Sequence, residues 1–309
     1  MATIFISDLN PIQFSLITNL PVGKNPDIFS NRFELRNQRS VYFSNAYYHQ
    51  KWQKATAIPL QIITEGYGLL AIKLVDAQGN QVGATQPFTL VSNTAVQAPY
   101  ITQSVIVDLS LQPDGIYSLI ILDGAVELFA SEWINLRVDF PNCLKFDYQH
   151  TTNIFNTYWL PSFQPSIFVE AIFNPIQPGT ESENFIDSLH DVYQLNSRTF
   201  DKQMLILGGN SGLPDYLSRK LNILLNLNRV SVEGVRWSKA TPEALVPLVT
   251  EVSTPMQCWS IIMSPSIAVT GLNFNGTAVV NQGIQVYSLN TAALGVDNGV
   301  VQNIEVVNP

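Results

Sequence analysis

The residues of this chain best placed to do chemistry form a glycine-rich turn, Gly208–Gly212, with the sequence GGNSG. An apolar run precedes this turn and an amphipathic stretch follows it, so a strand and a helix should flank it. A phosphate-binding loop has the same order but needs a lysine after its last glycine, where Leu213 stands here. The last glycine of a Gly-x-Ser-x-Gly nucleophile elbow would also fall on Leu213. We therefore interpret the turn as conformational, because glycine and asparagine accept positive φ.

One histidine has acidic neighbours in the sequence. Glu183 and Asp187 precede His190 and Asp191 follows it, a spacing that on a helix could hold a cation. A solvated helix face explains the same residues without a ligand, and we favour it. The chain has no HExxH, no paired CxxC and no local Ser/His/Asp arrangement. We predict no catalytic, cofactor-binding or metal-binding residue and no cofactor, hence a protein that is not an enzyme.

The two cysteines, Cys143 and Cys258, are too far apart to predict a disulfide framework or a zinc site. We expect buried free thiols, consistent with assembly in a reducing cytoplasm. Residues Met1–Ile17 lack a basic start and are interrupted by Asp8 and Pro11, so we expect no signal peptide. Since no run of about 18 uninterrupted apolar residues occurs, we expect no membrane span.

The glycine turn must be held by the elements around it. Thr199–Leu207 and Arg229–Val235 predict strands, and residues 214–226 predict a helix with Pro214 in its first turn. The buried stripe of this helix should consist of Leu217, Leu221, Leu224 and Leu225. Its solvent-facing side should hold Arg219, Lys220 and Asn222.

Several short sequence motifs lie in this stretch and upstream of it. They are Leu195-Asn196-Ser197, Gly208-Gly209, Gly212–Tyr216, Lys220-Leu221-Asn222 and Val232-Glu233-Gly234, with Tyr48–Gln53, Ile58–Gln61, Leu74–Asn80 and Ser131–Leu136 upstream. Together they resemble a pattern in tail- and baseplate-region structural proteins of phages and prophages of the Bacteroidota. The resemblance covers residues 40–263 in patches, and its motifs are structural rather than catalytic. It implies a role in virion assembly.

The composition also points to assembly. The 309 residues suffice for two domains, each with its own core. Charged residues make up only 13% of the chain, against about 25% in an average globular protein, so we infer burial between subunits. The formal net charge of −8 argues against a nucleic-acid partner, because phosphate backbones select basic faces. Plain solubility explains the same net charge.

Residues 41–138 predict an immunoglobulin-like β-sandwich. Short apolar runs alternate there with turn residues: Ile58–Ile63, Leu69–Val75, Phe88–Val91, Ser104–Leu109, Gly115–Leu122 and Ala125–Ala130. Gly79 and Gly124 should sit in hairpin turns, since both can take positive φ.

Residues 139–263 predict a second β-rich (α+β) domain around the central helix. Further strands are expected at Leu144–Tyr148, Trp159–Phe173 and Trp259–Met263. Pro175–Glu183 is expected to be a loop. A short helix or irregular turn should follow at Phe185, Leu189 and Val192.

The two ends of the chain differ from its middle. Residues 1–40 predict an N-terminal arm with a strand at Thr3–Ile6, because prolines interrupt regular structure after it. Its basic stretch, Asn31–Ser40, is interpreted as solvated, with a docking site for an acidic neighbour as the alternative. Residues 264–309 contain no Lys or Arg and predict a β-rich assembly tail that pairs with a neighbouring subunit. Alternatively, this tail completes the sheet of the second domain.

These features predict a mainly β virion structural protein, an oligomeric subunit of a phage tail (hub, baseplate or adaptor) or a related injection machine. Its partners should be copies of itself, in a ring-like homo-oligomer, and other virion structural proteins. We expect it in the virion, after assembly in the host cytoplasm. Three alternatives are a double jelly-roll capsid protein, a carbohydrate-binding module with Trp52 and Trp159 as stacking platforms, and a hydrolase using acids within Glu181–Asp191.

Overall fold

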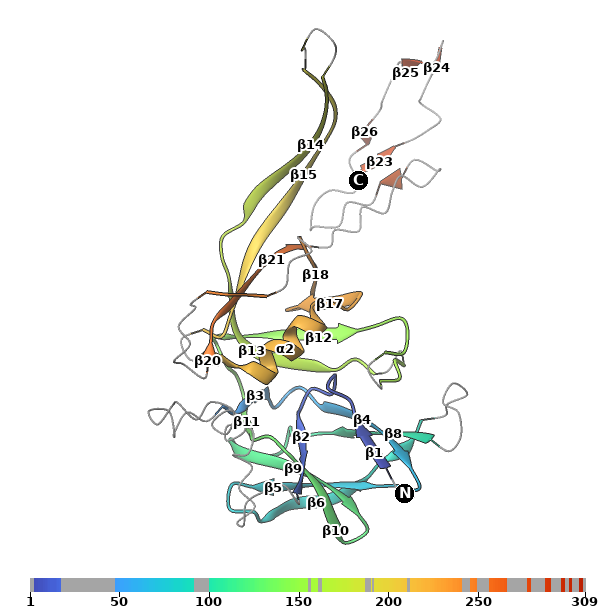
Figure 1. Ribbon diagram of the computed structural model, residues 1–309, viewed down its shortest axis with the longest axis vertical. Coiled ribbons are helices and arrows are strands. Elements are labelled where there is room, and N and C mark those ends of the chain that lie inside the picture. Colours follow the sequence, from blue (N-terminus) through green and yellow to red (C-terminus); the bar gives the residue numbers. More distant parts are fainter. Residues whose placement is uncertain are drawn as a thin grey trace. The chain divides into compact units, whose positions relative to one another are not determined.

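The computed structural model describes residues 3–17, 48–91, 100–154, 157–160, 163–186, 190, 192–209, 212–240, 245–248 and 256–265, and five short strands between 277 and 307 (Figure 1). The fold is mainly β, as predicted, with one helix in this described part. The chain divides into two compact units, Met1–Ser264 and Pro265–Pro309.

The first half of the larger unit is a β-sandwich. One sheet has the strand order β1 (Thr3–Ile6), β4 (Ile58–Glu65), β8 (Tyr100–Val107) and β7 (Thr89–Leu90). The facing sheet contains β3 (Gln50–Gln53), β11 (Ile134–Arg137), β9 (Gly115–Asp123), β5 (Ala71–Asp76), β6 (Gln81–Pro87), β10 (Val126–Ser131) and β2 (Phe14–Leu16). Alternate side chains of both sheets, such as Leu60 and Leu119, meet in one apolar core. The strands predicted within residues 41–138 are confirmed, with ends shifted by a few residues.

Both predicted hairpin turns are confirmed. Gly79, between β5 and β6, has a φ of 83°, and Gly124, between β9 and β10, has a φ of 57°. The Asp76 carboxylate accepts hydrogen bonds from the backbone N–H groups of Gln78 and Asn80, at 2.9 and 2.8 Å. An acceptor at the first position of the turn and a glycine inside it fix the local register before any distant contact is made.

The second half of the larger unit closes into a barrel. Its six strands follow one another around the ring as β12 (Cys143–Gln149), β13 (Ser166–Phe173), β15 (Val192–Leu207), β21 (Trp259–Pro265), β18 (Val235–Lys239) and β17 (Arg229–Val232). The pairing of β17 with β12 closes the ring. On the sandwich side, Phe168 of β13 lies opposite Lys51 of β3, so the sheet runs on from one half to the other.

Helix α2 (Asp215–Leu224) packs against the barrel core, as the central helix was predicted to do. Its stripe of Leu217, Leu221 and Leu224, with Leu225 after it, is at most 4% exposed. Pro214 precedes the first helical residue with an extended backbone. Proline is favoured at a helix start because its missing N–H would have had no partner there.

The loop expected at Pro175–Glu183 is wrong. From Gln177 on, this segment belongs to β14 (Gln177–Ile186), which pairs with β15 at ten cross-strand positions, whereas Pro175 and Ile176 lie outside the strand. Pro178 and Gly179 fit because β14 is an edge strand, where a missing N–H breaks no second ladder. Phe185 and Val192 lie in β14 and β15 rather than in a short helix or irregular turn, and Leu189 lies outside the described residues.

The single strand expected at Arg229–Val235 is a hairpin of β17 and β18. Glu233 and Gly234 join the strands with φ values of 50° and 77°, and two consecutive positive φ values are typical of a type I′ turn. Short pairings complete the larger unit: β16 (Leu213–Pro214) with β20 (Met256–Gln257), and β19 (Val246–Pro247) with β21. In the smaller unit, β22 (Thr277–Ala278), β23 (Tyr287–Leu289) and β26 (Val306–Val307) form one sheet, and β24 (Val296–Asp297) pairs with β25 (Val300–Val301).

Candidate functional site

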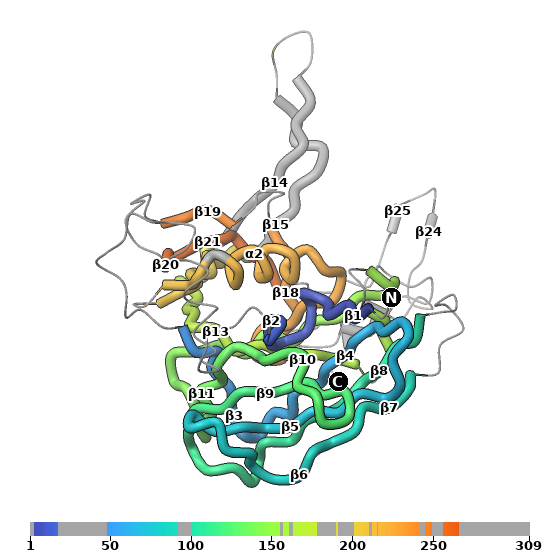
Figure 2. Tube along the Cα trace, turned by 60° about the horizontal axis from the view of Figure 1, so that its bottom comes forward, coloured from blue at the N-terminus to red at the C-terminus, as the bar shows by residue number. Residues whose placement is uncertain are grey.

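The segment Ser7–Phe14, here called the N-terminal clasp, joins the two halves of the larger unit (Figure 2). Residues 1–40 were expected to form an arm, but the described residues 3–17 are built into the fold. β1 pairs with β4 and β2 pairs with β10. Leu9 belongs to the barrel core, whereas Ile12 belongs to the sandwich core. Burial of apolar side chains on both sides therefore holds the clasp in place.

Buried polar groups fix the path of the clasp. The Asn10 amide donates to the Gln61 carbonyl at 2.7 Å, and its oxygen accepts the Gln61 N–H at 2.8 Å. The Tyr148 hydroxyl of the barrel donates to the Leu9 carbonyl at 2.7 Å. Asn10, Gln61 and Tyr148 are at most 2% exposed, so water cannot reach their polar groups. The hydrogen bonds within the protein satisfy these groups instead.

A second set of contacts ties the clasp to helix α2 and to the connection between β10 and β11. Glu132, in that connection, accepts a hydrogen bond from the Gln13 N–H at 2.9 Å and another from the Tyr216 hydroxyl. The Lys220 ammonium donates to the carbonyls of Asn10 and Pro11, the latter at 3.0 Å. Glu132 is 2% exposed and Lys220 4% exposed. We call Glu132, Tyr216 and Lys220, together with the clasp atoms they bind, the polar lock.

Burial controls the electrostatics of the polar lock. It lowers the pKa of the Lys220 ammonium to about 8, although the carboxylates of Glu132 and Asp8 act in the opposite direction. It also raises the pKa of the Glu132 carboxyl, against the effects of Lys220, the Tyr216 hydroxyl and the Gln13 N–H. Burial and the Glu132 charge raise the pKa of Tyr216 well above its ordinary value, so this hydroxyl remains a donor at neutral pH.

A lysine, a tyrosine and a carboxylate could serve as general acids and bases. In the polar lock, however, all three bind groups of the protein itself, and Glu132 and Lys220 are buried while Tyr216 is partly buried. Groups held in this way make a junction between segments that are distant in the sequence. The polar lock therefore connects the clasp to helix α2 and to the β10–β11 connection.

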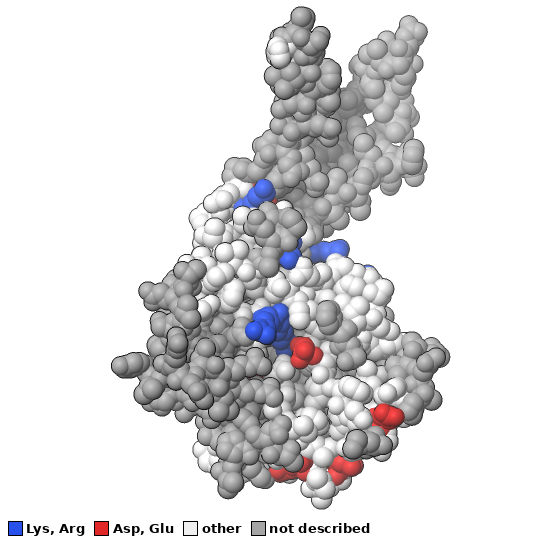
Figure 3. Space-filling model, in the orientation of Figure 1, with Lys and Arg blue, Asp and Glu red and all other residues white. Residues whose placement is uncertain are grey.

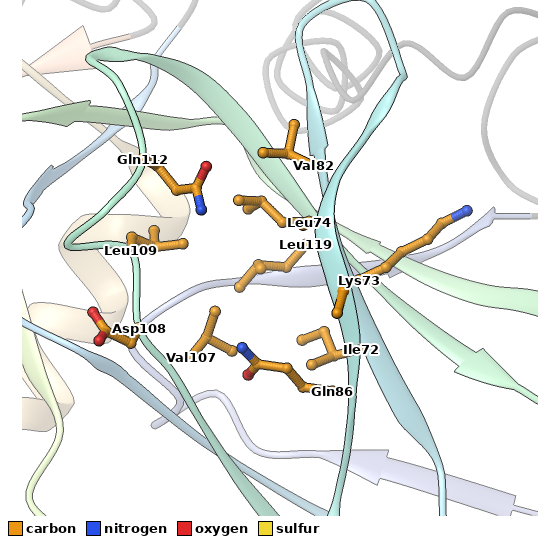
Figure 4. A pocket seen from close by; sticks show the side chains of 12 residues that line it. Ile72, Lys73, Leu74, Val82, Gln86, Val107, Asp108, Leu109, Gln112 and Leu119 are labelled. Carbon is orange, nitrogen blue, oxygen red and sulfur yellow. The ribbon is translucent and has the colours of Figure 1, made fainter.

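A cavity of about 90 Å³ lies elsewhere, in the sandwich between β5, β6, β8 and β9 (Figure 4). Leu74, Val82, Leu109 and Leu119 face this space, and the Lys73 side chain points away from it. The Lys73 ammonium forms an ion pair with Glu127 at 2.6 Å instead. Gln86, Asp108 and Gln112 also line the cavity, but its lining residues include no serine, cysteine or histidine that could act as a nucleophile or as a general base.

The glycine turn has the conformation that the sequence predicted. Gly208, Gly209 and Gly212 have φ values of 104°, 48° and 74°. A Cβ at Gly212 would lie 2.7 Å from the backbone carbon of Met256, so this position also lacks room for a side chain. Asn210 and Ser211 lie outside the described residues.

The described part of the acidic group near His190 is not helical. Glu183 is in β14, His190 is exposed with a φ of 67°, and Asp187 and Asp191 lie outside the described residues. No group of three or more His, Cys, Asp or Glu residues that could hold a metal occurs among the residues with described positions. Cys143 and Cys258 are free thiols, as expected, but are partly rather than fully buried.

Sequence reasoning missed the polar lock. Lys220 was expected on the solvent-facing side of α2, but it is buried. A signal was present, because Lys220 follows Leu217 by three residues and precedes Leu224 by four, which places it beside the apolar stripe. Nothing in the local sequence of Glu132 marks it as buried, since its partners come from residues 13 and 216.

Searches for related proteins gave no match to the chain among protein-family models, curated proteins or solved structures. Within the described residues, no helix has the length and apolar character needed to cross a membrane.

Proposed function

We propose that this protein is a virion structural protein, an oligomeric subunit of a phage tail (hub, baseplate or adaptor) or of a related injection machine. The observation that carries the proposal is the ribbon of β14 and β15. The two strands pair with each other at ten positions. Along Val192–Phe200 of β15 and along β14, no further strand of the described structure lies beside the ribbon. An isolated two-stranded ribbon is marginally stable in water, so a neighbouring subunit that covers this one would stabilise it.

The surface of the larger unit supports the same proposal. On the face shown in Figure 3, most of the described surface belongs to neither basic nor acidic residues. On the four-stranded sheet, Phe5, Tyr100 and Ile106 are 39%, 38% and 64% exposed. Strand alternation and register place all three on the outer face of this sheet, with the Phe5 and Tyr100 rings 6.0 Å apart. Low charge and outward apolar side chains favour burial against other protein chains.

The rival functions fit the described residues less well. Trp52 and Trp159, the stacking platforms of a carbohydrate-binding module, are 0% and 9% exposed and lie in the two cores. A double jelly roll would need a second eight-stranded domain, whereas the barrel here has six strands and an accompanying helix. Of the acids within Glu181–Asp191 that a hydrolase would use, Glu181 and Glu183 lie in the edge strand β14, and Asp187 and Asp191 lie outside the described residues.

We also propose that the sandwich is immunoglobulin-like. Tyr117, near the start of β9, donates its hydroxyl hydrogen to the Pro113 carbonyl at 3.0 Å. A tyrosine that bonds back to the backbone just upstream is a hallmark of such sandwiches. An experimental structure in which the strand connections of this sandwich differ from the immunoglobulin order would contradict the assignment.

The proposed function is tested by the mass and shape of the purified protein. Sedimentation and light scattering at micromolar concentration should give a multimer, and electron microscopy should show a closed, symmetric assembly. The same measurements should be made with companion virion structural proteins added. A monomer that binds none of them would refute the proposal.

A further inference from the structure

Over most of the length of the β14–β15 ribbon, no described strand pairs with either of its two outer edges. Only Gln203–Leu207 of β15 pairs with barrel strands, namely β13 and β21. The segment Val192–Phe200 of β15 pairs with β14 and with no other described strand. β14 itself pairs only with β15 among the described strands. Each edge therefore offers a row of backbone N–H and C=O groups to an incoming strand.

The two edges differ in charge. Between Gln177 and Ile186, β14 carries Glu181 and Glu183 and no basic residue. Along Val192–Phe200, the charged residue of β15 is Arg198. Glu181 and Arg198 are partners in the backbone register of one ribbon, so the edge strand β14, here called the acidic edge, and the edge strand β15, the basic edge, carry residues of opposite charge at the same level.

We propose that β14 of one copy pairs along β15 of a second copy, head to tail, so that successive ribbons form one continuous antiparallel sheet. The proposal rests on the proposed function, because it assumes that the protein self-associates. The two strands of a ribbon are antiparallel. When the next copy is related by rotation about a common axis, its β14 runs in the same direction as the first β14 and is therefore antiparallel to the β15 that it joins. The acidic edge of each copy then meets the basic edge of the next.

The competing arrangement is a two-fold dimer in which β14 pairs with β14. It would bring Glu181 and Glu183 of both copies to one seam, and like charges on neighbouring strands are unfavourable. A head-to-tail contact uses two different surfaces, so it repeats and closes into a ring when the rotation permits. The charge difference between the two edges thus selects a ring over a two-fold dimer.

Charge reversal tests the contact in the full-length chain. Arg198→Glu makes both edges acidic, and Glu181→Arg removes the acidic partner at the level of Arg198, so each variant alone should lose multimers by at least tenfold in light scattering. An equimolar mixture of the two variants should reassemble, since each then offers an edge that complements the other. Arg236→Glu, on an exposed position of barrel strand β18, makes the same charge change as Arg198→Glu and should leave the multimer intact.

Each result has a defined meaning. If the unmodified protein is a monomer that binds no companion protein, the proposed function fails before the ribbon is tested. If the unmodified protein assembles and Arg198→Glu assembles equally well, the head-to-tail contact is wrong while the function stands. A third outcome is that neither single variant forms multimers, alone or mixed with the other, while the double variant Glu181→Arg/Arg198→Glu does. In that case the charges act only within one ribbon, and the proposal is overturned.

Discussion

Replacing Lys220 by methionine removes the one cation of the polar lock while keeping an unbranched side chain of similar length. The wild-type protein should gain stability as the pH rises, because burial lowers the folded-state pKa of Lys220 from its usual 10.5 to about 8. Between these values the unfolded chain binds more protons than the folded one, so the free energy of unfolding rises with pH. This stabilisation is complete above pH 10.5 and is lost as the pH falls through 8.

The size of the effect follows from the two pKa values. One pKa unit corresponds to about 1.4 kcal/mol, so Lys220 should add about 2 kcal/mol to the free energy of unfolding between pH 7 and pH 9.5. Stopping at pH 9.5 limits the ionisation of tyrosines in the unfolded chain, and the part that occurs is common to both proteins and cancels in the difference. Lys220→Met lacks this increment, while Lys51, Lys239 and Cys143 titrate in both proteins and cancel in the difference.

The assay is urea unfolding at pH 7, 8, 9 and 9.5, followed by tryptophan fluorescence. At every pH, Lys220→Met also leaves the carbonyls of Asn10 and Pro11 without their donor, at a cost of about 1–3 kcal/mol for each group. Arg219→Met, at the exposed neighbouring position, is the matched control and should run parallel to wild type. Parallel curves for Lys220→Met and wild type would show that Lys220 titrates normally and would refute the buried polar lock.

Four further predictions concern other parts of the chain. Gly212→Val should lower the free energy of unfolding by about 1–3 kcal/mol or more, because it combines positive φ with a clash against Met256, whereas Gly68→Val, with open space around it, should cost little in the same urea titration. Ser211→Ala should leave folding unchanged, and loss of a measurable hydrolysis in a folded variant would contradict a conformational turn. Tyr148→Phe should cost about 1–2 kcal/mol by leaving the Leu9 carbonyl without its donor, and an unchanged urea midpoint would argue against the clasp. Deletion of residues 264–309 should preserve a cooperative melt while abolishing multimers, because we expect assembly to need the tail as well as the ribbon contact; a truncated chain that unfolds outright or still assembles would assign the tail another role.

The features that the sequence by itself determined are those set by short-range physics. The hairpins at Gly79 and Gly124 depend on backbone freedom at single positions, and the leucine stripe of α2 depends on helical spacing. Strands of the sandwich were recognisable because apolar runs alternate with turn residues. The mainly β fold could therefore be predicted before any long-range contact was known.

Tertiary structure decided which polar residues are buried and which segments pair. Glu132 carries no local mark of burial, and the spacing of Lys220 places it beside the leucine stripe without naming its partners, because the partners of both residues lie 84 to 210 residues away in the chain. The sequence of Pro175–Glu183 favours a loop, yet cross-strand pairing with β15 makes it a strand. The clasp was missed for the same reason: Leu9 and Ile12 acquire their two cores only when the barrel and the sandwich have formed around them. Local propensity is worth a few tenths of a kcal/mol to about 1 kcal/mol per residue, so burial and pairing with distant segments override it.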